Sequence, residues 1–151
     1  MIRSVFFLLA GVVLLAWAVP SQAATSNIDI RIIYAVKDKV NSVDPALDDI
    51  KGELQELPFS KFRLLDHLET KVQMNGTVEL QFPGDRTIAV TFKGIDTSKG
   101  KKMLSLQVAI KPAAKIELRI ADGGRAMFIG PTHKDGKLIV DVSAKLKEKG
   151  S

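Results

Sequence analysis

The stretch GPTHKDGKLIV, residues 130–140, holds one of the two histidines of the chain beside basic, acidic and glycine residues. A phosphate-binding loop requires G-x-x-x-x-G-K-[ST] between a strand and a helix, because backbone amides and the helix N-terminus hold the phosphates. Here Gly130 and Gly136 are six positions apart instead of five, Lys137 is followed by leucine, and a strand-like run comes next. We therefore interpret residues 134–136 as a turn between two strands.

Other patterns for catalysis or metal binding are missing from the sequence. The two histidines, His67 and His133, are far apart, and with no cysteine and no H-x-x-x-H spacing a zinc site is not expected. No G-x-S-x-G elbow marks a nucleophilic serine. We therefore predict a protein that is not an enzyme and has no catalytic residues, cofactor or metal.

A weak basic stripe supplies the candidate site residues. Lys61, Arg63, His67 and Lys71 share one face if their segment is a strand, although Glu69 interrupts them. The chain carries 22 Lys and Arg against 17 Asp and Glu, and its basic residues are scattered. Nucleic-acid binding would need a denser patch with stacking aromatic residues, so we predict a solvated sheet face instead.

Asp66 is the remaining candidate, because it falls among apolar residues on the inward side of its predicted strand. A buried acid would have a raised pKa, as functional carboxylates often do. Alternatively, a strand end or a bulge turns Asp66 toward solvent, and the sequence favours this second interpretation.

Alternation of apolar and polar residues dominates the rest of the chain and predicts half-buried strands. Eight segments show it, and their inward residues begin with Ile28, Ile30, Ile32, Tyr34 and Val36, then Phe62, Leu64, Leu68 and Val72, and end with Leu138, Val140, Val142, Ala144 and Leu146. Tight turns at Asn75-Gly76, 83–85 and 122–124 connect them and favour antiparallel pairing from residue 61 onward. We expect a mainly β (α+β) fold, an antiparallel β-sandwich or barrel-like meander.

One helix is predicted before these turns. Asp44 can act as its N-cap, Pro45 suits its first position, and apolar residues recur at helical spacing up to Pro58. This helix should pack on a face or an open end of the sheet.

The N-terminus has the order of a secretory signal peptide. Arg3 precedes an unbroken apolar run over residues 5–19, and Ser21 and Ala23 form a small-x-small cleavage site. A run of this length is short for a membrane span, which needs about 20 residues. We predict a signal peptide over residues 1–23, a single β-rich domain over 24–146 and a short polar tail over 147–151.

Two segments resemble a family of exported bacterial β-rich proteins of unassigned function. They are VDPALDDIKGELQELPFSKFRLLDH, residues 43–67, and GPTHKDGKLIVDVS, residues 130–143. The resemblance implies a common architecture and export, and it supplies no catalytic residues.

Function follows from what the sequence lacks. The absence of cysteine excludes a lipid-modified cysteine and favours a bacterial periplasmic or secreted protein. We expect an interaction module, or accessory subunit of an envelope or secretion assembly, that binds another envelope protein and no nucleic acid. A lipid- or glycan-binding β-sandwich is the alternative, and a hydrolase is the third possibility.

Overall fold

The structure, a computed structural model, describes residues 24–112 and 114–147, so the predicted signal peptide and the last four residues lie outside the described part. The elements in chain order are β1 (Thr25–Val36), β2 (Ser42–Val43), a 3-10 helix (Pro45–Ile50), α1 (Lys51–Gln55), β3 (Lys61–Gln73), β4 (Thr77–Phe82), β5 (Arg86–Ser98), β6 (Lys101–Lys111), β7 (Ala114–Ala121), β8 (Gly124–His133) and β9 (Gly136–Leu146). The predicted mainly β fold is confirmed. The very short β2 is the strand that the sequence did not reveal.

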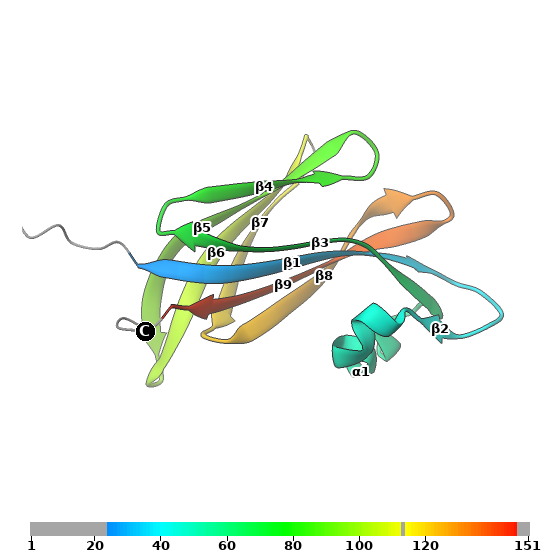
Figure 1. The fold of residues 1–151 in the computed structure, drawn as a ribbon, viewed down its shortest axis with the longest axis horizontal. Helices are drawn as coiled ribbons and strands as arrows, with labels where there is room; N and C mark the ends of the chain where they lie inside the picture. The colour runs from blue at the N-terminus through cyan, green and yellow to red at the C-terminus, as the bar shows by residue number, and fades with distance from the viewer. Residues whose placement is uncertain (1–23, 113, 148–151) are drawn as a thin grey trace, which may run out of the picture.

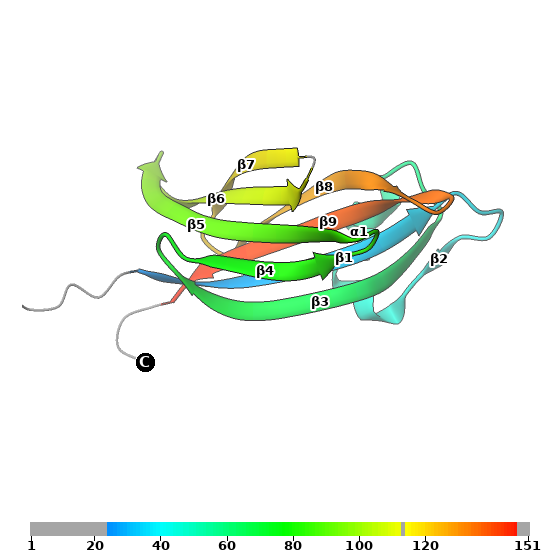
Figure 2. The ribbon, with the colours of Figure 1, turned by 90° about the horizontal axis from the view of Figure 1, so that it is seen from above.

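The strands form two sheets that lie face to face (Figures 1 and 2). The five-stranded sheet has the order β2-β3-β1-β9-β8, and the four-stranded sheet has the order β4-β5-β6-β7. All pairs are antiparallel except β2 with β3. In Figure 2 the five-stranded sheet extends beyond the four-stranded sheet at the end where β1 finishes and β3 begins.

The space between the two sheets is filled by the inward residues that alternation predicted. Burial of these aliphatic and aromatic side chains is the main favourable contribution to folding. The fully buried members include Ile28, Ile30 and Ile32 of β1, Phe92 of β5, Leu104 and Leu106 of β6, and Leu138 and Val140 of β9.

The predicted antiparallel meander from residue 61 onward is correct for β4 to β7 and for the β8–β9 pair, but wrong for the steps from β3 to β4 and from β7 to β8. β3 pairs with β1, and β9 lies between β1 and β8, so the five-stranded sheet joins the two ends of the described chain. The turn at Asn75-Gly76 is a corner between sheets rather than the hairpin that its sequence suggested, because β3 and β4 belong to different sheets. Gly76 is needed there, since a Cβ would lie 2.8 Å from the carbonyl oxygen of Gln73.

The turn predicted at residues 134–136 is confirmed. Lys134 and Asp135 connect β8 to β9, and Lys134 has a positive φ of 51°. Gly136 follows at a close approach to β1, where a Cβ would clash with the carbonyl oxygen of Ala35. The glycine and the turn residues of this loop therefore serve backbone geometry.

The predicted helical segment packs against the outer face of the five-stranded sheet. It begins as a 3-10 helix, where the Asp44 side chain accepts a hydrogen bond from the Ala46 amide, and continues as α1. The second oxygen of Asp44 accepts the Leu64 amide of β3 at 3.1 Å and ties the helix start to the sheet. The residues of this second core are Ile33, Ala35, Leu47, Ile50, Leu54, Phe62 and Ile139.

A β-bulge in β3 decides which side chains face the helix and which face the sandwich core. Ile32 is opposite Asp66 and Ile33 is opposite Leu64, so Leu65 is the extra residue. Phe62 and Leu64 therefore pack in the second core beneath the helix, whereas Val72 packs between the sheets. The prediction that Phe62, Leu64, Leu68 and Val72 share one side is wrong, because alternation reverses across the bulge.

Candidate functional site

The bulge also separates the basic residues that the sequence placed on one face. Lys61 and Arg63 are opposite Val36 and Tyr34, and they lie on the inner side of the five-stranded sheet. His67 and Lys71 are opposite Arg31 and Asn27 on its outer side. The structure therefore brings the four cations to two different surfaces, and the predicted single stripe does not exist.

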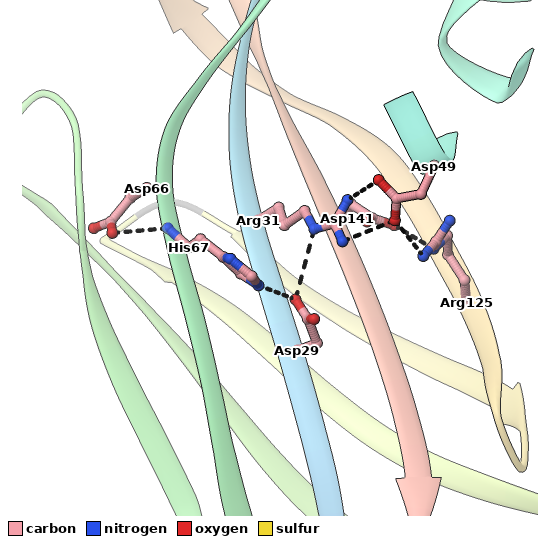
Figure 3. A network of polar contacts seen from close by, with 7 residues as sticks. All are labelled: Asp29, Arg31, Asp49, Asp66, His67, Arg125 and Asp141. Carbon is pink, nitrogen blue, oxygen red and sulfur yellow. Dashed lines mark hydrogen bonds and ion pairs between the residues drawn. The ribbon is translucent and has the colours of Figure 1, made fainter. Parts of the chain in front are cut away.

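Asp66 is exposed to solvent, and a bulge lies next to it. One of its carboxylate oxygens accepts the backbone amide of His67 at 2.8 Å. Figure 3 shows Asp66 and the His67 ring on opposite sides of β3. Asp66 and His67 therefore do not form a catalytic pair.

His67 instead belongs to a network of charged residues on the outer face of the five-stranded sheet (Figure 3). Its Nε2 lies 2.8 Å from Oδ1 of Asp29, and the Nε of Arg31 lies 3.8 Å from the same oxygen. Arg31 also donates two hydrogen bonds of 2.8 Å to the carboxylate of Asp49 in the 3-10 helix. This hydrogen bonding raises the pKa of Arg31 and lowers the pKa of Asp49.

Asp141 of β9 lies in the same network and is the buried acid of the described chain. Asp141 is only 2% exposed. Burial raises the pKa of its carboxyl group to about 6, although the nearby Arg125 and Arg31 oppose the shift. Nε of Arg125 lies 3.2 Å from Oδ1 of Asp141 without hydrogen-bond geometry, so this oxygen has no hydrogen-bond donor among the described residues. Arg125 also approaches Asp49 at 3.7 Å.

Sequence reasoning missed Arg31, Asp49, Arg125 and Asp141. Ile139 and Asp141 lie on the same outer face of β9, a strand that is buried on both faces for part of its length. An acid within this mostly apolar run was the one signal available in the sequence. The network joins β1, β3, β8, β9 and the 3-10 helix, so it depends on pairings between distant segments.

This network is suited to holding the helical segment on the sheet rather than to catalysis. Arg31 and Arg125 each connect a strand to Asp49, and the second core lies beside them. Within the described residues, no group of three or more His, Cys, Asp or Glu side chains could hold a metal ion.

A second feature of the surface is an apolar notch between β7 and β8. It has a volume of about 220 Å³ and is lined by Ile110, Ala114 and Ile116 on one side, by Phe128, Ile129, Gly130 and Pro131 on the other, and by Arg86. β7 and β8 are joined by a turn at residues 122–123 but belong to different sheets, and Figure 1 shows them diverging from that turn. The notch opens beside the edge of β7.

Two further observations concern the chain as a whole. None of the helices in residues 24–112 and 114–147 has the length and apolar character needed to cross a membrane. Comparisons with protein-family models, with curated proteins and with solved structures each gave no significant match. The resemblance to exported bacterial proteins stays a prediction.

Proposed function

We propose that this protein is a non-enzymatic binding module of the bacterial envelope that holds an extended segment of another exported protein along the edge of β7. One observation carries the proposal. β7 is an edge strand of eight residues in the described chain, and the apolar notch opens directly beside it. An exposed strand edge offers unpaired backbone groups to an added strand, and adjoining pockets give such binding its specificity.

The other strand edges are less suited to this binding. β3 has a bulge at Leu65 and is already paired with β2 at its start, and bulges are among the features that protect edges from pairing. β8 has a register shift between Ile129 and Thr132 together with a proline, and β4 has only six residues. β7 has regular pairing with β6 along its whole length.

The notch suits an apolar side chain of the added strand. In a strand next to β7, alternate side chains would point toward the side that Ile116 and Leu118 occupy. A cavity of about 150 Å³ is known to take up benzene in a protein interior, and the notch volume is about 220 Å³. Exposed apolar surface at Ile129, which is 45% exposed, continues the notch outward.

The proposed location in the envelope is supported by the N-terminal sequence. A basic residue, an apolar run and a small-x-small site occur in the order of a signal peptide. The lack of cysteine agrees with a bacterial exported protein that depends on its core instead of disulfides.

A charge placed in the notch tests this proposal. Ile129→Glu should abolish recovery of the partner from gently cross-linked envelope extract, because a carboxylate in an apolar site must be desolvated. Val40→Glu is the matched control, since Val40 is the other exposed large hydrophobic residue in the described chain and does not line the notch. Circular dichroism and thermal melting should show that both variants fold.

The comparison of the two variants decides the outcome. Loss of one defined partner with Ile129→Glu and its retention with Val40→Glu would support binding at the notch. Equal recovery with both variants, or no partner with the unchanged protein, would contradict the proposal.

A further inference from the structure

A basic groove is lined by residues at the end of the five-stranded sheet where β1 finishes and β3 begins. Figure 2 shows that this end of the sheet extends beyond the four-stranded sheet. The volume of the groove is about 480 Å³, within the range of small-molecule sites. The lining residues come from the end of β1, the loop after it, the start of β3 and the β8–β9 turn, and they are Tyr34, Val36, Lys37, Asp38, Lys61, Arg63, Lys134 and Asp135. This groove is separate from the apolar notch, with which it shares no lining residue.

The charges of the groove do not balance. Four cations, Lys37, Lys61, Arg63 and Lys134, stand against two carboxylates, which leaves an excess of two positive charges. Both carboxylates already have partners. Asp38 lies 3.9 Å from the Lys61 ammonium and accepts the Lys39 amide, and Asp135 accepts the hydroxyl hydrogen of Tyr34.

Lys37, Arg63 and Lys134 make no ion pair among the described residues, and Arg63 is the one of these three that carries a planar set of donors. No carboxylate among the described residues lies within ion-pair distance of it, and its guanidinium carbon is 6.0 Å from the Tyr34 ring centroid. A guanidinium held against an aromatic ring keeps a planar set of N–H donors that can bind two oxygens of one anion.

The walls of the groove are fixed by contacts that do not use these donors. The Tyr34 and His133 rings are nearly perpendicular with their centroids 5.6 Å apart, and the Tyr34 hydroxyl donates a hydrogen bond to Asp135. The Ser60 hydroxyl accepts the Asp38 amide at 2.6 Å and donates to the Asp38 carbonyl at 2.8 Å, which ties the loop after β1 to the start of β3. A ligand would therefore enter a site whose shape is already formed.

We propose that this groove binds the phosphate group of a small acidic ligand, with Arg63 as the main donor and Lys134 and Lys37 as supporting charges. A phosphate monoester carries about −1.5 to −2 charges at pH 7, which matches the excess of two positive charges. The rest of the ligand would lie against Tyr34 and Val36. This binding is independent of strand addition at β7.

Calorimetric titration with inorganic phosphate and with glycerol 3-phosphate tests the site. Saturable binding is expected for both probes, and Arg63→Gln should raise the dissociation constant about tenfold, because it removes charge-assisted hydrogen bonds. Lys134→Gln should weaken binding less. Lys71→Gln is the matched control, since Lys71 is on the same strand but on the outer face of the sheet.

Vesicles of phosphatidylcholine with or without phosphatidic acid, a lipid whose phosphate is a monoester, distinguish a lipid headgroup from a free phosphate. Binding of the free phosphates that depends on Arg63 supports the proposal with a soluble ligand. Binding only to anionic vesicles, again lost with Arg63→Gln, supports it with a headgroup as the source. No saturable binding of any probe, or equal weakening by Lys71→Gln, would overturn it.

Discussion

Nε of Arg125 lies 3.2 Å from Oδ1 of Asp141, a buried carboxylate oxygen that receives no hydrogen bond from any described residue. Burial destabilises the charged form of a carboxylate when no hydrogen bond compensates for the lost water. This explains the elevated pKa of Asp141. The ion pair with Arg125 only partly offsets the burial. The stability of the protein should therefore depend on the protonation of this one side chain.

The folded-state pKa of Asp141 is about 6, against 3.8 for an ordinary aspartate. Because the folded value is higher, the contribution of this residue to stability is fully present below about pH 4 and is lost as the pH rises through 6. The two pKa values differ by about 2 units, which corresponds to roughly 3 kcal/mol. The free energy of unfolding should fall by up to that amount between pH 4 and 7 through Asp141 alone.

Asp141→Asn should remove this dependence. Urea unfolding of the unchanged protein and of the variant, measured at steps from pH 4 to 7, gives the difference that isolates Asp141 from other carboxylates. The difference in unfolding free energy should change by up to about 3 kcal/mol over this range. Parallel pH profiles for the two proteins would show that Asp141 titrates normally.

The paired hydrogen bonds between Arg31 and Asp49 should hold the helical segment on the sheet. Asp49→Asn is expected to lower the free energy of unfolding by about 1 kcal/mol, the upper value for a partly exposed ion pair. Asp48→Asn is the control, because Asp48 is adjacent in the same helix and makes no ion pair among the described residues. Similar losses in both variants would assign the effect to the helix rather than to Arg31.

Leu54 tests whether the second core belongs to the fold. It is fully buried between α1 and the outer face of the five-stranded sheet. Leu54→Ala should cost about 3 kcal/mol through lost burial and the cavity that remains, measured by urea unfolding. A cost below about 1 kcal/mol would mean that the helical segment packs loosely.

Gly136 and Gly52 should respond to alanine in opposite directions. At Gly136 the new Cβ would meet the Ala35 carbonyl oxygen, so we expect a loss of about 2 kcal/mol or more from overpacking. At Gly52 in α1 nothing lies within 4 Å, so Gly52→Ala should raise stability by up to about 1 kcal/mol. Thermal melting of both variants measures these effects. An unchanged melting temperature for Gly136→Ala would contradict the close approach of Gly136 to β1.

Local sequence patterns predicted most of the fold, because alternation reports which side of a strand is buried. They placed Ile28, Ile30 and Ile32 correctly, and they placed the turn at residues 134–136. They failed at Leu64-Leu65, where one extra residue reverses the alternation and moves the Phe62 side chain to the helix side. Two adjacent leucines are compatible with a bulge but do not specify one.

The candidate sites were less predictable, because they depend on which strands pair. Arg31 meets Asp49 and Asp141 only because β1 lies between β3 and β9 and the helix crosses the same face. The apolar notch likewise requires β7 and β8 to belong to different sheets. The pairing of strands that are distant in the sequence cannot be predicted from the local pattern of residues within either strand.

The most direct test of binding at β7 is to map amine cross-links in the complex recovered from envelope extract. The account predicts a complex larger than the protein alone, with partner peptides linked at Lys115 of β7 and not at Lys71 of β3. A protein recovered only as free monomer, or a partner linked at Lys71 and never at Lys115, would contradict it.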